Sequence, residues 1–304
     1  MSCTSPTLAI ITAVDEDGKK HISLKPGLLQ PGYFDMAKLE AIYGKDRVLL
    51  LPCGKCDSCR MTKRKDWAIR CACEAKYHLY NSFVTLTYDD SHLPRDYKLK
   101  KSDLQKFIKG LRNKGHKLRY FACGEYGSNN GRPHYHLICF GYMPSDKKRV
   151  GKSNCGEAMY ESKEVSDVWK KGRTIVQDFS PAAAGYVAGY AAKKLGDCSS
   201  FIIMSKRPGI GLSFASEKLN DIYSYDLIVG DFGKIKKYRP PRYFDKVAEK
   251  LGVDLTEIKA KRIKESNDNV LYKMRAYGYT RKEQAIVHDS TLNKKKADGL
   301  RRDL

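Results

Sequence analysis

The chain lacks any apolar stretch long enough to cross a membrane as a helix. Its N-terminus also lacks the basic start of a secretory signal, and the apolar run from Leu8 to Val14 is too short to act as one. Neither an internal repeat nor a low-complexity block is present, which excludes repeat arrays and argues against global disorder. We therefore expect a globular protein of the cytoplasm that has no membrane partner.

Acidic residues are also scarce relative to basic ones. Against 35 Asp and Glu stand 57 Lys and Arg, so the 304-residue chain carries a formal net charge of +22. Such a surplus attracts polyanions and speeds encounter with them. A basic surface that serves only solubility is the alternative, but the excess runs along the whole chain, which favours a long nucleic-acid binding track.

Ten cysteines are present without an export signal, so we expect reduced thiols rather than disulfides. Cys53, Cys56 and Cys59 are spaced as C-x2-C-x2-C, which indicates a structural zinc site. Candidates for a fourth ligand are Cys71, Cys73 and His78. A set of buried thiols near the start of a helix is the alternative, and the spacing leaves both interpretations open. Several basic residues nearby, among them Arg64 and Arg70, are candidates for DNA contacts or for a solvated helix face.

Helical and strand-like patterns alternate through the middle of the chain. The predicted helices are residues 61–80, 102–111, 162–170 and 180–195, and the predicted strands are 83–88, 118–126, 134–142 and 174–179. This order indicates an α+β fold in which helices pack on an antiparallel-rich central sheet. We expect three parts: an irregular N-terminal segment with the cysteine cluster (1–60), a central domain (61–211) and a basic, partly helical C-terminal appendage (212–304).

A candidate metal site lies in the predicted hairpin. Alternation along a strand puts His134 and His136 on one face, and a symmetrically closed loop puts Glu125 opposite His134 on that face. These N and O ligands suit Mg²⁺ or Mn²⁺ acting on a phosphate, although imidazole also accepts zinc. The alternative is a pair of histidines at a partly exposed edge. It is disfavoured because the rest of the strand is apolar on both faces, as in a central strand.

The predicted helix 180–195 carries the candidate nucleophiles. Its sequence GYVAGYAAKK spaces Tyr186, Tyr190 and Lys193 so that all three project from one helical face. The intervening residues are alanines and glycines, which leave the two phenols clear of the helix surface. A helix packed through its alanines with two core tyrosines is the alternative, and this motif alone does not decide between them.

These motifs, in this order, resemble those of the HUH-superfamily rolling-circle replication initiators. The matching features are the strand FVTLTYDDSHLP, the H-Y-H strand with Glu125 before it, and the Y-x3-Y-x2-K helix. The chain is most similar to the initiators of gokushoviruses, small single-stranded DNA phages of the Microviridae. That similarity rests on the blocks CGKCDSCRMTKRKDWAIR, FVTLTYDDSHLP, CGEYGSNNGRPHYHLICFG and SKRPGIG. The resemblance covers roughly residues 50–215 and makes 61–211 an HUH endonuclease domain.

The resemblance implies a metal-dependent endonuclease and strand transferase that nicks single-stranded DNA at a viral origin and rejoins the strands. The three hairpin ligands would hold Mg²⁺ or Mn²⁺ at the scissile phosphate. Tyr186 or Tyr190 would attack to form a 5′-phosphotyrosine link, and Lys193 would favour the phenolate. Such a protein works in the cytoplasm of a host bacterium, with a host helicase and polymerase as partners.

Two other hypotheses stay open at this point. A relaxase or transposase of the same superfamily shares the chemistry but differs in substrate. A non-catalytic, zinc-containing nucleic-acid-binding protein belongs to another class, and metal-dependent covalent capture of DNA would separate the two classes. A histidine-triad nucleotide hydrolase is disfavoured, because Ile138 stands where a third alternating histidine would fall.

Overall fold

The computed structural model describes residues 3–16, 18, 20–26, 29, 35–127, 131–153, 156–193, 200–231, 235–280, 284–285, 287–289, 291–292 and 295. Side chains at 181–182, 190–193, 230–231 and 235–236 lie outside the described part. The chain divides into two compact units, Met1–Thr62 with Thr256–Arg302, and Lys63–Leu255 with Asp303–Leu304. The expected division into three parts stays a prediction.

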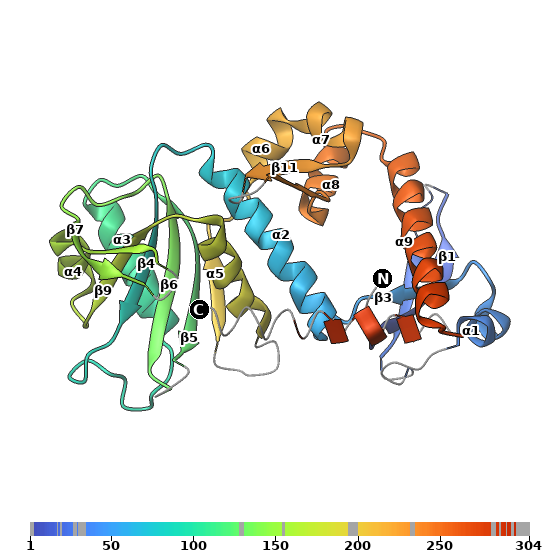
Figure 1. Cartoon of the computed structure of the whole chain (residues 1–304), viewed down its shortest axis with the longest axis horizontal. Helices are drawn as coiled ribbons and strands as arrows, with labels where there is room; N and C mark the ends of the chain where they lie inside the picture. Colours follow the sequence, from blue (N-terminus) through green and yellow to red (C-terminus); the bar gives the residue numbers. More distant parts are fainter. Residues whose placement is uncertain are drawn as a thin grey trace. The chain divides into compact units, whose positions relative to one another are not determined.

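The first unit contains a three-stranded antiparallel sheet in the order β2-β1-β3 (Figure 1). Its elements are β1 (Thr7–Val14), β2 (Lys20–Lys25), α1 (Met36–Tyr43), β3 (Val48–Leu51) and α9 (Thr256–Tyr277). Leu8 and Val48 of the sheet pack against Leu39 of α1 in a small buried core. The prediction of irregular structure over residues 1–60 is therefore wrong, because the apolar run at Leu8 forms a strand that pairs with one some forty residues later.

The second unit is built on a seven-stranded antiparallel sheet in the order β10-β5-β6-β4-β9-β8-β7 (Figure 1). The strands are β4 (Asn81–Thr87), β5 (Arg119–Tyr126), β6 (Pro133–Phe140), β7 (Lys148–Lys152), β8 (Ala158–Glu161), β9 (Thr174–Asp178) and β10 (Phe201–Met204). The helices are α2 (Asp57–Ala75), α3 (Lys101–Asn113), α4 (Lys163–Trp169), α5 (Pro181–Lys193), α6 (Leu212–Glu217), α7 (Leu219–Tyr225) and α8 (Arg242–Lys250). A separate hairpin joins β11 (Ile228–Asp231) to β12 (Ile235–Tyr238).

Helices cover both faces of the seven-stranded sheet. On one face, α3 and α4 bury Phe107 and Trp169 against Leu137 and its neighbours. On the other face, α5 and the end of α2 bury Val187 and Cys71 against Ile138. Burying each large apolar side chain stabilises the fold by about 1.5–3 kcal/mol. The two layers explain why the H-Y-H strand reads as apolar on both sides.

The central position predicted for this strand is confirmed, since β6 lies between β5 and β4. The α+β fold is also confirmed, with an antiparallel sheet and helices packed on it. All four predicted helices and all four predicted strands are found within a few residues of the expected bounds. Within the described ranges, no helix has both the length and the apolar character needed to span a membrane.

Candidate active site

The site begins with the hairpin of β5 and β6. Its register pairs Glu125 with His134, as the symmetric closure predicted. Backbone bonds from Gly127 N to Arg132 O (3.0 Å) and from Gly131 N to Gly127 O (3.1 Å) close the loop at its base. Because cross-strand partners share a face, Glu125 and the two histidines project from the same side of the sheet.

The three side chains converge on a single point. Nε2 of His134 and Nε2 of His136 each lie 2.8 Å from the same carboxylate oxygen, Oε1 of Glu125. The residues offer ligand atoms that all lie within 4.8 Å of one another, so the group could hold a metal ion. Glu125 and His136 are only 4% and 5% exposed, so this carboxylate and imidazole are shielded from bulk water.

Outer contacts leave both Nε2 atoms facing the centre of the group. Nδ1 of His134 donates to the carbonyl oxygen of Arg132 at 3.0 Å, which leaves the Nε2 lone pair of the neutral ring directed at Glu125. Nδ1 of His136 bonds to the Thr85 hydroxyl at 3.0 Å, and Phe83 stacks on the ring at 5.4 Å between centroids. A second partner on the far nitrogen is the usual arrangement of a metal-binding histidine.

The carboxylate itself fits a metal ligand. Oε2 of Glu125 is buried and has no hydrogen-bond partner among the described residues. A buried oxygen without a partner is costly, and a bound cation would remove that cost. Two lone pairs aimed at one carboxylate and one unsatisfied carboxylate oxygen therefore fit a divalent ion better than they fit a closed hydrogen-bond network.

The protonation states follow from burial and from the shared carboxylate. Burial opposes the charge on Glu125, but the bonds to the two histidines outweigh it, so the pKa of Glu125 lies below its usual value. Burial lowers the pKa of His136, which favours the neutral ring that metals bind. Burial also acts to lower the pKa of His134, but the adjacent carboxylate outweighs it and raises that pKa.

Tyr186 of α5 faces this group. Its hydroxyl lies 3.5 Å from Oε1 of Glu125, and its ring stands edge-on to His136 at 5.1 Å between centroids. The helix is held in this position by its N-cap, where the Ser180 hydroxyl accepts from Ala183 N at 3.1 Å, and by buried Val187 on the sheet side. The side chains of the other two predicted residues, Tyr190 and Lys193, lie outside the described part.

Two features of the site were not singled out from the sequence. Thr85 holds His136, yet a threonine in a strand carries no signal until β4 is placed beside β6. Arg64 of α2 lies against the small residues of α5, since its guanidinium carbon would be 3.4 Å from a Cβ built on Gly189. The glycines of GYVAGY thus make room for an arginine, which is a residue suited to phosphate contact.

A second group of ligand-type side chains lies in the first unit. It contains Cys3, Cys53, Cys56 and Cys59. The thiol that joins the three predicted ones is therefore Cys3, and not one of the predicted candidates Cys71, Cys73 or His78. Cys71 packs in the core against the sheet, and His78 bonds to Glu74.

The sheet, the hairpin ligands and the tyrosine helix lie in a segment that matches a known family. Residues 81–195, which run from β4 to just beyond α5, match the family of the replication-associated protein ORF2. The chain belongs to this family of replication-associated proteins.

Three curated relatives are similar over most of the chain. Replication-associated protein ORF2 of Spiroplasma virus 4 is 36% identical over 235 residues, which is 70% of this chain and 73% of that protein. Replication-associated protein VP4 of Bdellovibrio phage phiMH2K is 34% identical over 62% of this chain and 65% of its own. Replication-associated protein ORF4 of Chlamydia phage 1 is 31% identical over 66% of this chain and 54% of its own. No solved structure matches the chain.

Proposed function

We propose that the chain is a replication initiator that nicks single-stranded DNA at the origin of a small phage genome and later rejoins the strands. The observation that carries the proposal is the meeting of two imidazoles and a carboxylate with the Tyr186 hydroxyl 3.5 Å from that carboxylate. The replication-associated relatives, all from viruses or phages, support the biological role. The host bacterial cytoplasm is then the expected place of action, with a host helicase and polymerase as partners.

The proposed reaction exchanges one phosphodiester for another. The Tyr186 oxygen forms a bond to the scissile phosphorus, and the bond from phosphorus to the 3′ oxygen breaks. The phenol gives up its proton, and the departing 3′ oxygen takes one up, so the nick leaves a 3′ hydroxyl and a 5′-phosphotyrosine link. Because no water enters, the link keeps the energy needed for rejoining by the reverse attack.

The roles proposed for the remaining residues follow from their chemistry. Glu125, His134 and His136 would hold a divalent ion, Mg²⁺ or Mn²⁺, which when bound polarises the phosphate and offsets charge on the leaving oxygen. Tyr190, one helical turn from Tyr186, is proposed as the second nucleophile that cuts the regenerated origin. Lys193 is proposed to favour the phenolate.

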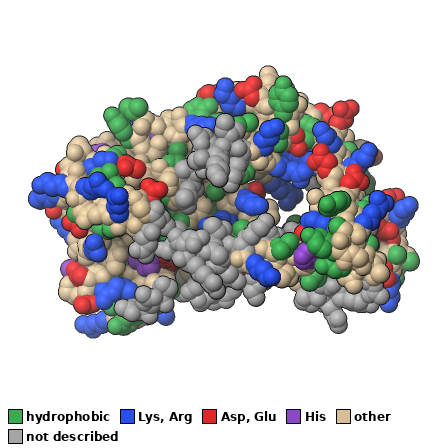
Figure 2. All heavy atoms as spheres, in the orientation of Figure 1, with side chains coloured by type: hydrophobic (Ala, Val, Ile, Leu, Met, Phe, Trp, Pro, Cys, Tyr) green, Lys and Arg blue, Asp and Glu red, His purple; other side chains and the backbone are tan. Residues whose placement is uncertain are grey.

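The substrate class is supported by charge. The net charge of +22 suits a DNA backbone, and Figure 2 shows lysine and arginine side chains spread over the visible face rather than gathered in one patch. Arg64, beside the glycines of α5, is the basic side chain that we propose contacts a phosphate near Tyr186.

The test uses labelled single strands from the origin region of the cognate genome, with Mg²⁺, with Mn²⁺ and without either. We expect cleavage and a covalent protein–DNA adduct only with metal. The double variant His134→Ala/His136→Ala should lose both activities and keep its circular dichroism spectrum. His92→Ala, which changes a histidine on the surface of the same unit, should keep both. Full nicking by the double variant would overturn the metal site, and DNA binding without any adduct would favour the non-catalytic alternative.

A further inference from the structure

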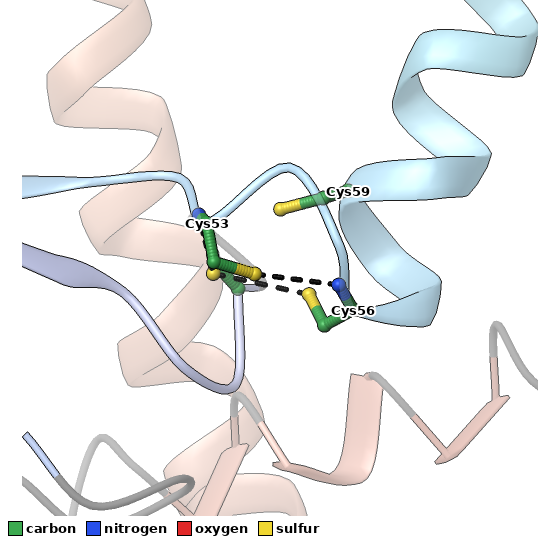
Figure 3. A group of neighbouring side chains, drawn as sticks. Cys53, Cys56 and Cys59 are labelled. Atoms are coloured by element: carbon green, nitrogen blue, oxygen red, sulfur yellow. Dashed lines mark hydrogen bonds between the residues drawn. The ribbon is translucent and has the colours of Figure 1, made fainter. Parts of the chain in front are cut away.

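Four cysteine thiols of the first unit meet at one place. The Sγ atoms of Cys3, Cys53, Cys56 and Cys59 all lie within 4.8 Å of one another. All four are free thiols. Figure 3 shows three of them, Cys53, Cys56 and Cys59, pointing toward a common centre from the loop after β3 and from the start of α2. The cluster is independent of the hairpin group, which belongs to the second unit.

The fold explains why residues fifty positions apart come together. β1 and β3 are antiparallel neighbours, and Thr7 at the start of β1 pairs with Leu51 at the end of β3. The residues before Thr7 and after Leu51 therefore leave the sheet at the same end, which brings Cys3 beside Cys53. Cys53 N donates to Cys3 Sγ at 3.3 Å.

A tight turn then brings in the other two thiols. Gly54 has φ +72°, a conformation that favours glycine, and it reverses the chain directly after Cys53. Backbone N–H groups of Lys55 and Cys56 donate to Cys53 Sγ at 3.4 and 3.3 Å. Such N–H donors stabilise a thiolate by spreading its charge. The first turn of α2 follows at Asp57 and presents Cys59 to the same centre.

The distances fit one tetrahedral ion. With a Zn–S bond of about 2.3 Å, the sulfurs of a tetrahedral site lie about 3.8 Å apart. Cys56 Sγ lies 3.8 Å from Cys3 Sγ. A disulfide would need about 2.0 Å between sulfurs, so this pair is too far apart to be bonded. Four sulfurs grouped this closely surround a single ion rather than a multi-iron cluster, whose thiolates bind different metal atoms.

We propose that Cys3, Cys53, Cys56 and Cys59 bind one structural Zn²⁺. Four thiolate ligands close the coordination sphere, so the ion has a role in folding and leaves no position for a substrate. It joins three pieces of the first unit: the segment before β1, the loop after β3, and the first turn of α2. A sheet of only three short strands has little core of its own, and a metal supplies the missing stability.

The test measures metal content in the full chain. The parent protein carries His134→Ala and His136→Ala, so that the hairpin group does not contribute, and it is purified without added metal or chelator. We expect one zinc per chain by mass spectrometry of the metal. Adding Cys3→Ser removes that zinc, whereas adding Cys73→Ser, which changes a buried cysteine outside the cluster, leaves it in place.

Two further measurements keep the proposal falsifiable if Cys3→Ser does not fold. Cys3→His supplies an imidazole in place of the thiol and should keep one zinc. Cobalt bound by the parent should show the charge-transfer bands of four thiolates, and these bands should weaken in Cys3→His. A full equivalent of zinc in folded Cys3→Ser, no zinc in the folded parent, or iron in its place would overturn the proposal. None of these results depends on nicking activity.

Discussion

Thr85 is the residue whose removal tests the metal site most gently. Thr85→Val keeps the shape of the side chain but removes the hydroxyl that lies 3.0 Å from Nδ1 of His136. His136 is 5% exposed, so water cannot readily replace this partner. Losing the outer partner of a metal-binding histidine typically costs about 10–100-fold in metal affinity, which corresponds to about 1.4–2.8 kcal/mol. The cost to folding should be smaller, about 1 kcal/mol, because one buried hydrogen bond is lost.

The assay is covalent capture of a labelled oligonucleotide as a function of Mn²⁺ concentration. We expect the concentration for half-maximal adduct to rise about 10–100-fold in Thr85→Val. The maximum at saturating Mn²⁺ should stay close to that of the unmodified protein, because the ligands and Tyr186 are in place. Thr87→Val is the matched control: Thr87 lies on the same face of β4, opposite His134, whose Nδ1 donates to Arg132 O instead. An unchanged Mn²⁺ requirement in Thr85→Val, or an equal shift in Thr87→Val, would refute the reasoning.

Two other predictions concern DNA affinity and stability. Affinity for single strands should fall about 100-fold between roughly 50 and 200 mM salt if about five phosphates are neutralised, and a salt-independent affinity would assign the basic surface another role. Burial raises the pKa of Asp66 to about 6, so this carboxyl favours folding when protonated, and the benefit is lost as pH rises from about 4 through about 6. Asp66→Asn should therefore add about 2 kcal/mol to the free energy of unfolding near about pH 8, relative to its effect near about pH 4. Urea denaturation at both pH values measures this, and an equal effect at both would contradict it.

The hairpin site could be predicted from the sequence because its determinants are local. Alternation fixes the face that His134 and His136 share, and a symmetric loop fixes Glu125 opposite His134. The apolar residues around them indicate a central strand without any knowledge of its neighbours. Tyr186 also follows from a local pattern, although its distance to Glu125 depends on how α5 packs on the sheet.

What the sequence did not predict depends on contacts between distant residues. The first-unit sheet pairs β1 with β3, and such short strands carry too little pattern to stand out from irregular structure. Cys3 could not be joined to the C-x2-C-x2-C group, because its place beside Cys53 is a result of that same pairing. Thr85 likewise gains a role only when β4 lies beside β6.

The most direct test of the account is to identify the residue that carries the DNA. A labelled origin oligonucleotide is captured with Mn²⁺, the adduct is digested with protease and nuclease, and the modified peptide is sequenced by mass spectrometry. We predict a phosphotyrosyl nucleotide on Tyr186 or Tyr190, adduct formation in each single Tyr→Phe variant, and none in Tyr186→Phe/Tyr190→Phe. A nucleotide on any other residue, or an adduct formed by the double variant, would contradict the proposed mechanism.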